Sequence, residues 1–281
     1  MKLYKKLLGT IMLGAAALSL ASCVSFDYYP DADKYLVGTQ YYDGELKTLD
    51  IDWISGSVTL IQDETADQIT VKEDNNLDDD RKVHSYFHDG ILSVKYCKSG
   101  LRFGNVKSVD KQLFVTFPSL ETLDLGITSG SANIEKLDAT TAKIHITSGD
   151  LNLGQINVDD FKVGMTSGEV SIASLNTKKA DFDSTSGKIT IDTLSTVEAD
   201  FDSTSGPIKV NIEKADKLSF DVTSGNIDLT IPEAGAKITL SKTSGKFTST
   251  REHTAENNVY TYGDGSCEIS IHITSGNVTI R

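Results

Sequence analysis

The tripeptide Thr-Ser-Gly recurs along the second half of the chain at a nearly fixed interval. It begins at Thr128, Thr147, Thr166, Thr185, Thr204 and Thr223, each 19 residues after the last, then at Thr243 after 20 residues and at Thr274 after 31. A fixed interval of this length is typical of stacked supersecondary units, each too small to bury its own apolar side chains. The repeat therefore predicts that each unit completes its core against the next.

Within each unit, apolar residues alternate with polar ones, as in Ala199 and Phe201 followed by Ile208 and Val210. A period of two indicates strands with one buried face. A further apolar residue between the two runs is expected to fill a corner of the unit: Leu137, Ile156, Leu175 and Leu194. Glycine at the third place of each tripeptide fits another corner, where the backbone needs positive φ or approaches the next unit closely. These corner glycines are Gly130, Gly149, Gly168, Gly187, Gly206, Gly225, Gly245 and Gly276.

The pattern predicts an all-β fold, a parallel β-solenoid with 19-residue rungs, each rung being one turn of the coil. The rungs should lie about 4.8 Å apart, and a right-handed coil is expected because parallel crossovers are right-handed. A β-sandwich of short strands is the alternative, but strict spacing with one repeated corner favours the solenoid.

The first 22 residues resemble a bacterial lipoprotein signal. Lys2, Lys5 and Lys6 precede the apolar run 7–20, and Leu20-Ala21-Ser22 leads to Cys23. In such signals the peptidase cuts before a cysteine that carries diacylglycerol, so the resemblance implies lipidation at Cys23, with fatty acids such as palmitate. An ordinary signal peptide and an uncleaved anchor helix are the alternatives.

The remaining chain divides into three expected parts. Residues 23–45 are acidic and rich in tyrosine and are expected to form a tether. Residues 46–118 hold degenerate strands that form an atypical N-terminal cap, and residues 119–281 form the solenoid repeats. A hairpin insertion at about 249–268 contains turn residues and is expected to fold over the open end of the stack.

The charge of the chain excludes one class of partner. Lys and Arg number 27 against 40 Asp and Glu, and loss of the three signal lysines takes the net charge from -13 to -16. A nucleic-acid binder needs the opposite sign. So acidic a protein also does not bind anionic lipid through charge alone.

An acidic cluster is the candidate metal site. Aligning the 19-residue units places Asp181 and Asp200 in one outward column and Asp183, Asp202 and Asp221 in another. Like charges on neighbouring rungs repel unless they are screened or bridged, so the cluster is interpreted as a solvated acidic face or as a weak calcium site. The only histidines that could share a strand face are His84 and His88, interpreted as exposed strand residues or as a metal-binding pair.

No catalytic constellation stands out in the sequence, so we expect no enzymatic activity and no cofactor. No arginine lies between Arg102 and Arg251, and the serines belong almost entirely to the repeated corners. Export and an even count favour a disulfide between Cys97 and Cys267. However, about eight rung steps separate them in a single stack, or nearly 40 Å, so we expect no such bridge.

The chain from Leu46 to Arg281 resembles the bacterial putative-adhesin family of β-strand repeat proteins. The resemblance rests on the opening segment 51–58, the serial Thr-Ser-Gly corners and the closing segments 262–265 and 273–280. It implies a β-solenoid outside the cytoplasm with a role in adhesion or envelope stress, and it implies no catalytic residue.

These observations lead us to expect a lipid-anchored module on the extracytoplasmic face of the bacterial cell membrane. Its expected partners are the membrane, through the lipid, and a glycan or an envelope protein that binds the polar face, with no nucleic acid. One alternative is an envelope-stress sensor or regulator that binds a membrane protein. The other is a carbohydrate-active β-helix enzyme.

Overall fold

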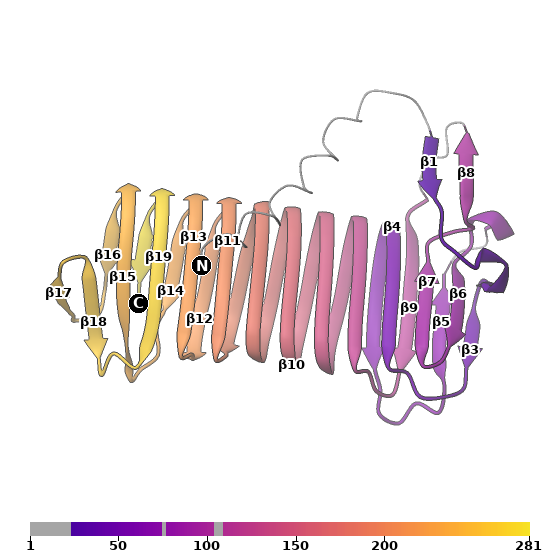
Figure 1. Ribbon diagram of the computed structural model, residues 1–281, viewed down its shortest axis with the longest axis horizontal. Coiled ribbons are helices and arrows are strands. Elements are labelled where there is room, and N and C mark those ends of the chain that lie inside the picture. The colour runs from indigo at the N-terminus through magenta and orange to yellow at the C-terminus, as the bar shows by residue number, and fades with distance from the viewer. Residues whose placement is uncertain (1–23, 75–76, 104–108) are drawn as a thin grey trace, which may run out of the picture.

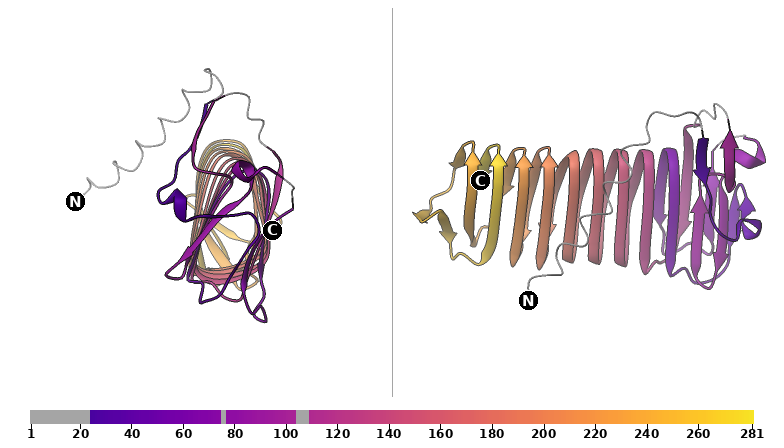
Figure 2. Two further views of the ribbon diagram at one scale, coloured as in Figure 1. Left: turned by 90° about the vertical axis from the view of Figure 1, so that its right-hand side faces the viewer. Right: turned by 45° about the horizontal axis from the view of Figure 1, so that its top comes forward.

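The structure, a computed structural model, describes residues 24–74, 77–103 and 109–281. Strands wind into an elongated stack, and its end view is a flattened loop with two long sides (Figures 1 and 2). Within the described ranges, the helical elements are two 3-10 helices of three residues, η1 (Ala32–Lys34) and η2 (Asp79–Arg81). The all-β, mainly parallel architecture predicted from the repeat is confirmed.

The strands of the central stack follow the alternating pattern of the sequence. The strand β10 (Thr122–Ser195) continues through successive turns, followed by β11 (Glu198–Ser205), β12 (Ile208–Lys214), β13 (Lys217–Ser224) and β14 (Ile227–Thr230). In the parallel register, Phe182 pairs with Phe201, and Phe201 pairs with Phe220. Each pair joins positions 19 residues apart, so equivalent residues of successive repeats lie side by side.

A column of phenylalanines fills the centre of the stack. The rings of Phe182 and Phe201 lie 4.7 Å apart between centroids and those of Phe201 and Phe220 lie 4.6 Å apart, both pairs nearly parallel. All three side chains are buried. The predicted corner residues Leu137, Ile156, Leu175 and Leu194 are buried as well. The inward positions assigned from the sequence therefore form one continuous apolar core.

At the N-terminal end, the order of strands in the stack differs from their order in the chain. The strand β4 (Thr48–Gln62) lies between β10 on one side and β7 (Ile91–Lys95) and β9 (Lys111–Phe117) on the other, with every pairing parallel. Beyond them, β5 (Ile69–Glu73) and β6 (His84–His88) pair antiparallel with β9 and β7. These outer strands form the predicted atypical cap.

The tyrosine-rich segment belongs to this cap and, where the structure describes it, is not a tether. The strand β2 (Leu36–Val37) pairs with β6, and β3 (Gln40–Tyr42) pairs with β5. Tyr29 is buried, and its hydroxyl donates to the carbonyl oxygen of Cys97 over 3.0 Å. The physical reason is the open end of the stack, whose sheet edges and apolar core need cover. A separate antiparallel pair joins β1 (Val24–Asp27) to β8 (Gly100–Phe103).

At the C-terminal end, the last segment of the chain occupies an interior rung. Residues 235–249 form β15 (Gly235–Ser244) and β16 (Phe247–Ser249), whereas the chain ends with β19 (Cys267–Ser275) and β20 (Val278–Ile280). The strand β19 lies between β13 and β15 (Figure 1), and β20 lies between β14 and β16. The chain therefore passes outward to form the final rung and then returns to fill the place beneath it.

A hairpin covers the outer edge of β15. The strands β17 (Thr254–Glu256) and β18 (Val259–Gly263) pair with each other, and β18 also pairs antiparallel with β15. This is the expected position of the hairpin insertion. Cys97 and Cys267 are both buried, near opposite ends of the stack, and no disulfide joins them.

Candidate functional site

The corner glycines form one column along the stack, and their role is structural. A Cβ on Gly149, where φ is +138°, would lie 1.6 Å from the carbonyl oxygen of Gly130. Real Cβ atoms essentially never come that close to another heavy atom, so the spacing of the rungs requires glycine there. The column extends beyond the predicted set to Gly56, which pairs with Lys111 at the cap.

The predicted acidic cluster is brought together in adjacent strands. Asp181 pairs with Asp200, and Asp183, Asp202 and Asp221 follow one another across β10, β11 and β13. Burial, followed by the charges of neighbouring carboxylates, raises the pKa of Asp183 and of Asp202. Among the described residues, no group of three or more His, Cys, Asp or Glu side chains has an arrangement that could hold a metal ion.

The two cap histidines do not converge on a common point. His84 is buried, and its Nδ1 lies 3.0 Å from the carbonyl oxygen of Lys82. His88 is exposed, stacks on Tyr86 and has Nε2 2.9 Å from a carboxylate oxygen of Asp89. The pair is therefore part of the packing and surface of the cap.

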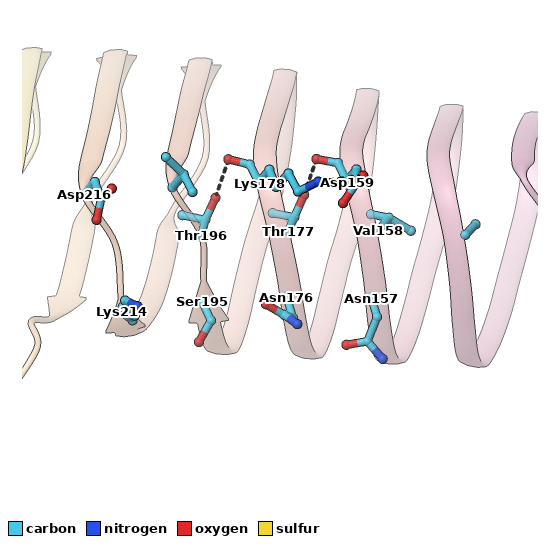
Figure 3. A pocket seen from close by; sticks show the side chains of 12 residues that line it. Asn157, Val158, Asp159, Asn176, Thr177, Lys178, Ser195, Thr196, Lys214 and Asp216 are labelled. Carbon is cyan, nitrogen blue, oxygen red and sulfur yellow. Dashed lines mark hydrogen bonds and ion pairs between the residues drawn. The ribbon is translucent and has the colours of Figure 1, made fainter.

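The candidate site is a groove along the corner opposite the Thr-Ser-Gly corner. Its volume is about 450 Å³, and it crosses several rungs (Figure 3). Three columns of side chains line it, each with one member per rung. They are Asn157, Asn176, Ser195 and Lys214; Ala139, Val158, Thr177 and Thr196; and Asp159, Lys178, Val197 and Asp216. We call this surface the corner groove.

Two buried threonines fix the backbone of the corner groove. The hydroxyl of Thr177 is within hydrogen-bonding distance of the carbonyl oxygens of Asp159, at 3.1 Å, and Lys179, at 2.9 Å. Thr196, one rung further, bridges its own rung to the previous one in the same way. Side chains that satisfy backbone groups at a bend hold it in one conformation. The groove is thus a preformed surface.

The rim of the corner groove presents neutral and charged polar groups. The amide of Asn157 donates to a carboxylate oxygen of Asp138 over 2.7 Å, and Asn176 is exposed on the next rung. Lys178 Nζ lies 2.9 Å from a carboxylate oxygen of Asp159. Both members of this ion pair are largely exposed, so the pair adds little stability and remains accessible to a ligand.

The chemistry of the corner groove fits binding better than catalysis. Its lining contains amides, hydroxyls and one exposed apolar side chain, Val197, but neither histidine nor cysteine. Ser195 Oγ donates to Glu213 over 2.9 Å, and no imidazole in the lining could take up its proton. The sequence placed Asn157, Asn176 and Ser195 directly after buried corner residues, and only this periodic position distinguished them from other surface residues.

The predicted lipidation site, Cys23, lies outside the described residues, one position before the start of β1. None of the helices described here is long and apolar enough to cross a membrane.

The fold and the corner groove define a repeat protein of stacked β-rungs with a polar groove along one corner. Residues 46–281 match the Toastrack DUF4097 family, and the chain belongs to this family. The match spans the same range as the resemblance found in the sequence, which is confirmed. No curated protein matches the chain.

Several solved structures are similar to the chain at low identity. A putative adhesin from Bacteroides fragilis is 14% identical, with 88% of this chain and 97% of that chain covered and a TM-score of 0.46. A putative adhesin from Parabacteroides distasonis is 11% identical, with coverage of 88% and 97% and a TM-score of 0.48. A putative lipid binding protein from the same species is 15% identical, with coverage of 87% and 97% and a TM-score of 0.44.

Proposed function

We propose that this protein is a non-enzymatic binding module of the bacterial cell envelope, anchored by lipid at Cys23, whose corner groove binds an extended neutral glycan. The observation that carries the proposal is the groove itself, which repeats the same three columns of side chains on successive rungs. A polymer that lies along the stack meets an equivalent set of groups at each rung. Many weak contacts then add up to useful affinity.

The composition of the groove favours a glycan over other polymers. The amide side chains of Asn157 and Asn176 each donate and accept hydrogen bonds, as does the hydroxyl of Ser195. Sugar hydroxyls have the same dual character. The net charge of -16 after signal removal disfavours polyanions, which leaves neutral chains as the best match.

The anchor and the geometry of the coil complete the proposal. The signal sequence supports cleavage before Cys23 and acylation of that residue, and two acyl chains supply the two signals that stable anchoring requires. The solenoid coils to the right with a 19-residue rung, in keeping with the 19-residue register between β10, β11 and β13.

A glycan screen tests this proposal. The mature chain with Cys23→Ser is applied to a panel of cell-wall and host glycans, and each positive glycan is titrated by calorimetry. We expect Asn157→Ala combined with Asn176→Ala to abolish binding. The matched control is Asn152→Ala, which removes an exposed asparagine from the flank of the stack, where it donates to Asn133.

Two outcomes contradict the proposal. One is the absence of binding across the panel, and the other is an equal loss of affinity in the control variant. Recovery of an envelope protein by crosslinking of intact cells, without glycan binding, would instead favour the stress-sensor alternative. Turnover of any polysaccharide would favour the enzyme.

A further inference from the structure

The exposed apolar side chains of the molecule are concentrated near the N-terminal cap. Among the described residues, seven large hydrophobic side chains are exposed: Tyr28, Leu36, Val37, Tyr41, Ile61, Ile91 and Val197. Six of them lie within 28–91, and only Val197 belongs to the central repeats. Single exposed apolar residues are common on protein surfaces, but a local concentration marks an interaction surface.

Four of these residues, Tyr28, Leu36, Val37 and Tyr41, lie in the segment that covers the end of the stack, and we call them the cap patch. They are 85%, 49%, 38% and 62% exposed, respectively. The chain pairs with β6 at β2 and with β5 at β3, so between these strands it crosses from one sheet to the other (Figure 2). The cap patch therefore borders the open end of the solenoid.

Contacts around Tyr29 hold the start of the cap patch in place. The Tyr29 and Tyr35 rings lie 4.6 Å apart, which brings their sequence neighbours Tyr28 and Leu36 near each other. The Tyr29 backbone N–H also donates to Ser99 Oγ over 3.1 Å. Tyr28 is thus exposed on a fixed piece of backbone.

The cap patch is continuous with the proposed lipid anchor. Cys23 directly precedes β1, and β1 is held to the cap by its pairing with β8, in which Val24 lies opposite Phe103. Five residues separate Cys23 from Tyr28, a reach of at most about 18 Å in a fully extended chain. No long linker can therefore separate the acyl chains from this end of the stack.

We propose that the cap patch rests on the lipid surface in which Cys23 is anchored. This inference rests on the proposed lipid anchor. Tyrosine and aliphatic side chains partition shallowly into the interface between headgroups and acyl chains. The solenoid then stands with its cap on the membrane, and the rungs that carry the corner groove lie further from the bilayer.

Charge near the cap patch selects the kind of lipid. Asp31 forms an ion pair with Lys34 at 3.2 Å, whereas Asp33 and Asp43 add negative charge to the same segment. Anionic headgroups would be repelled. The surface therefore fits zwitterionic lipid.

Spin-label accessibility tests the proposal on the lipidated protein. The variants Leu36→Cys, Tyr41→Cys and Val197→Cys each carry a nitroxide on an exposed site, and Val197 is the control on the central repeats. The native Cys97 and Cys267 are buried. Collision rates with oxygen and with a water-soluble nickel chelate are measured before and after transfer into phosphatidylcholine vesicles.

We expect the labels at positions 36 and 41 to lose access to the nickel chelate and to gain access to oxygen in vesicles, with no change at position 197. Unchanged access at positions 36 and 41, in a protein that carries fatty acid and floats with the vesicles, would overturn the cap proposal alone. A protein that carries no fatty acid and does not float would overturn the anchor and the cap proposal together.

Discussion

Gly276 lies directly against Gly225, and an added Cβ on Gly276 would be 1.7 Å from the carbonyl oxygen of Gly225. Gly245 lies on the other side of Gly276 in the same column. The last corner of the chain is thus an interior member of the glycine column. The order Gly225, Gly276, Gly245 shows that the final strand is inserted between two rungs that precede it in sequence.

The first prediction concerns this insertion. Gly276→Ala should destabilise the protein through a strained φ of +142° and through the clash with Gly225. Gly265→Ala is the matched control, because Gly265 also has positive φ but its nearest neighbour would be 3.4 Å away. We expect a loss of about 1 kcal/mol in the control from backbone strain and about 1–3 kcal/mol more in Gly276→Ala from overpacking. Equal losses in urea denaturation would refute the close approach.

The second prediction concerns the phenylalanine column. Phe201→Ala removes a fully buried ring that stacks on Phe182 and Phe220. We expect the free energy of unfolding to fall by about 3–5 kcal/mol, since lost burial adds to the cost of a cavity. Denaturation of the mature, Cys23→Ser chain measures this loss, and a change below about 1 kcal/mol would show that the ring is not part of a packed core.

The third prediction concerns the acidic columns and pH. The pKa of Asp202 is raised by burial and by the charges of Asp183 and Asp221. Because its folded-state pKa exceeds the unfolded value of about 3.9, its contribution to stability is fully present below that value and is lost as pH rises through the folded-state pKa.

Asp202→Asn should therefore stabilise the protein at pH 7 and make no difference at about pH 3, where the carboxyl is protonated in both states. Thermal unfolding across this range measures the difference, with Asp150→Asn as the control because Asp150 lies outside these columns. A variant that is less stable than the parent at pH 7 would show that the carboxylate is bridged by an ion or another partner.

The fourth prediction concerns a buried ion pair in the cap. Lys111 Nζ lies 2.6 Å from a carboxylate oxygen of Glu73, both side chains are almost fully buried, and the ammonium also donates to the carbonyl oxygen of Arg81 over 2.8 Å. Glu73→Gln leaves the ammonium without its counter-charge, which should cost about 3–5 kcal/mol.

Replacing both partners, Glu73→Leu with Lys111→Met, should recover most of this loss, because an apolar pair carries no uncompensated charge. Chemical denaturation of the three proteins makes the comparison. A double variant as unstable as Glu73→Gln would mean that the pair acts through the surrounding hydrogen bonds instead.

The sequence predicts the parts of this fold that depend on local alternation. Phe182 and Phe201 occupy equivalent places in the repeat, and the parallel register pairs them. It does not predict the place of the last strand, because the interval from Thr223 to Thr243 is compatible with direct stacking of those two rungs. The one signal lies in charge: Lys217 and Lys237 would face each other in direct stacking, whereas Glu268 pairs with both in the structure.

The cap and the corner groove were beyond the sequence for different reasons. Tyr29 and Tyr42 lie in a segment without regular alternation, and only the open end of the stack gives them something to cover. The groove residues Asn157 and Asn176 look like any solvated corner in sequence. Their function-bearing property is the hollow between rungs, which is set by tertiary packing.

The most direct test of the binding role is a two-dimensional NMR spectrum of side-chain amides, recorded with and without a glycan that binds. We expect the amide signals of Asn157 and Asn176 in the corner groove to shift, while those of Asn133 and Asn152 on the flank stay in place. Shifts at Asn133 and Asn152, with Asn157 and Asn176 unchanged, would contradict the assignment of the corner groove as the binding site.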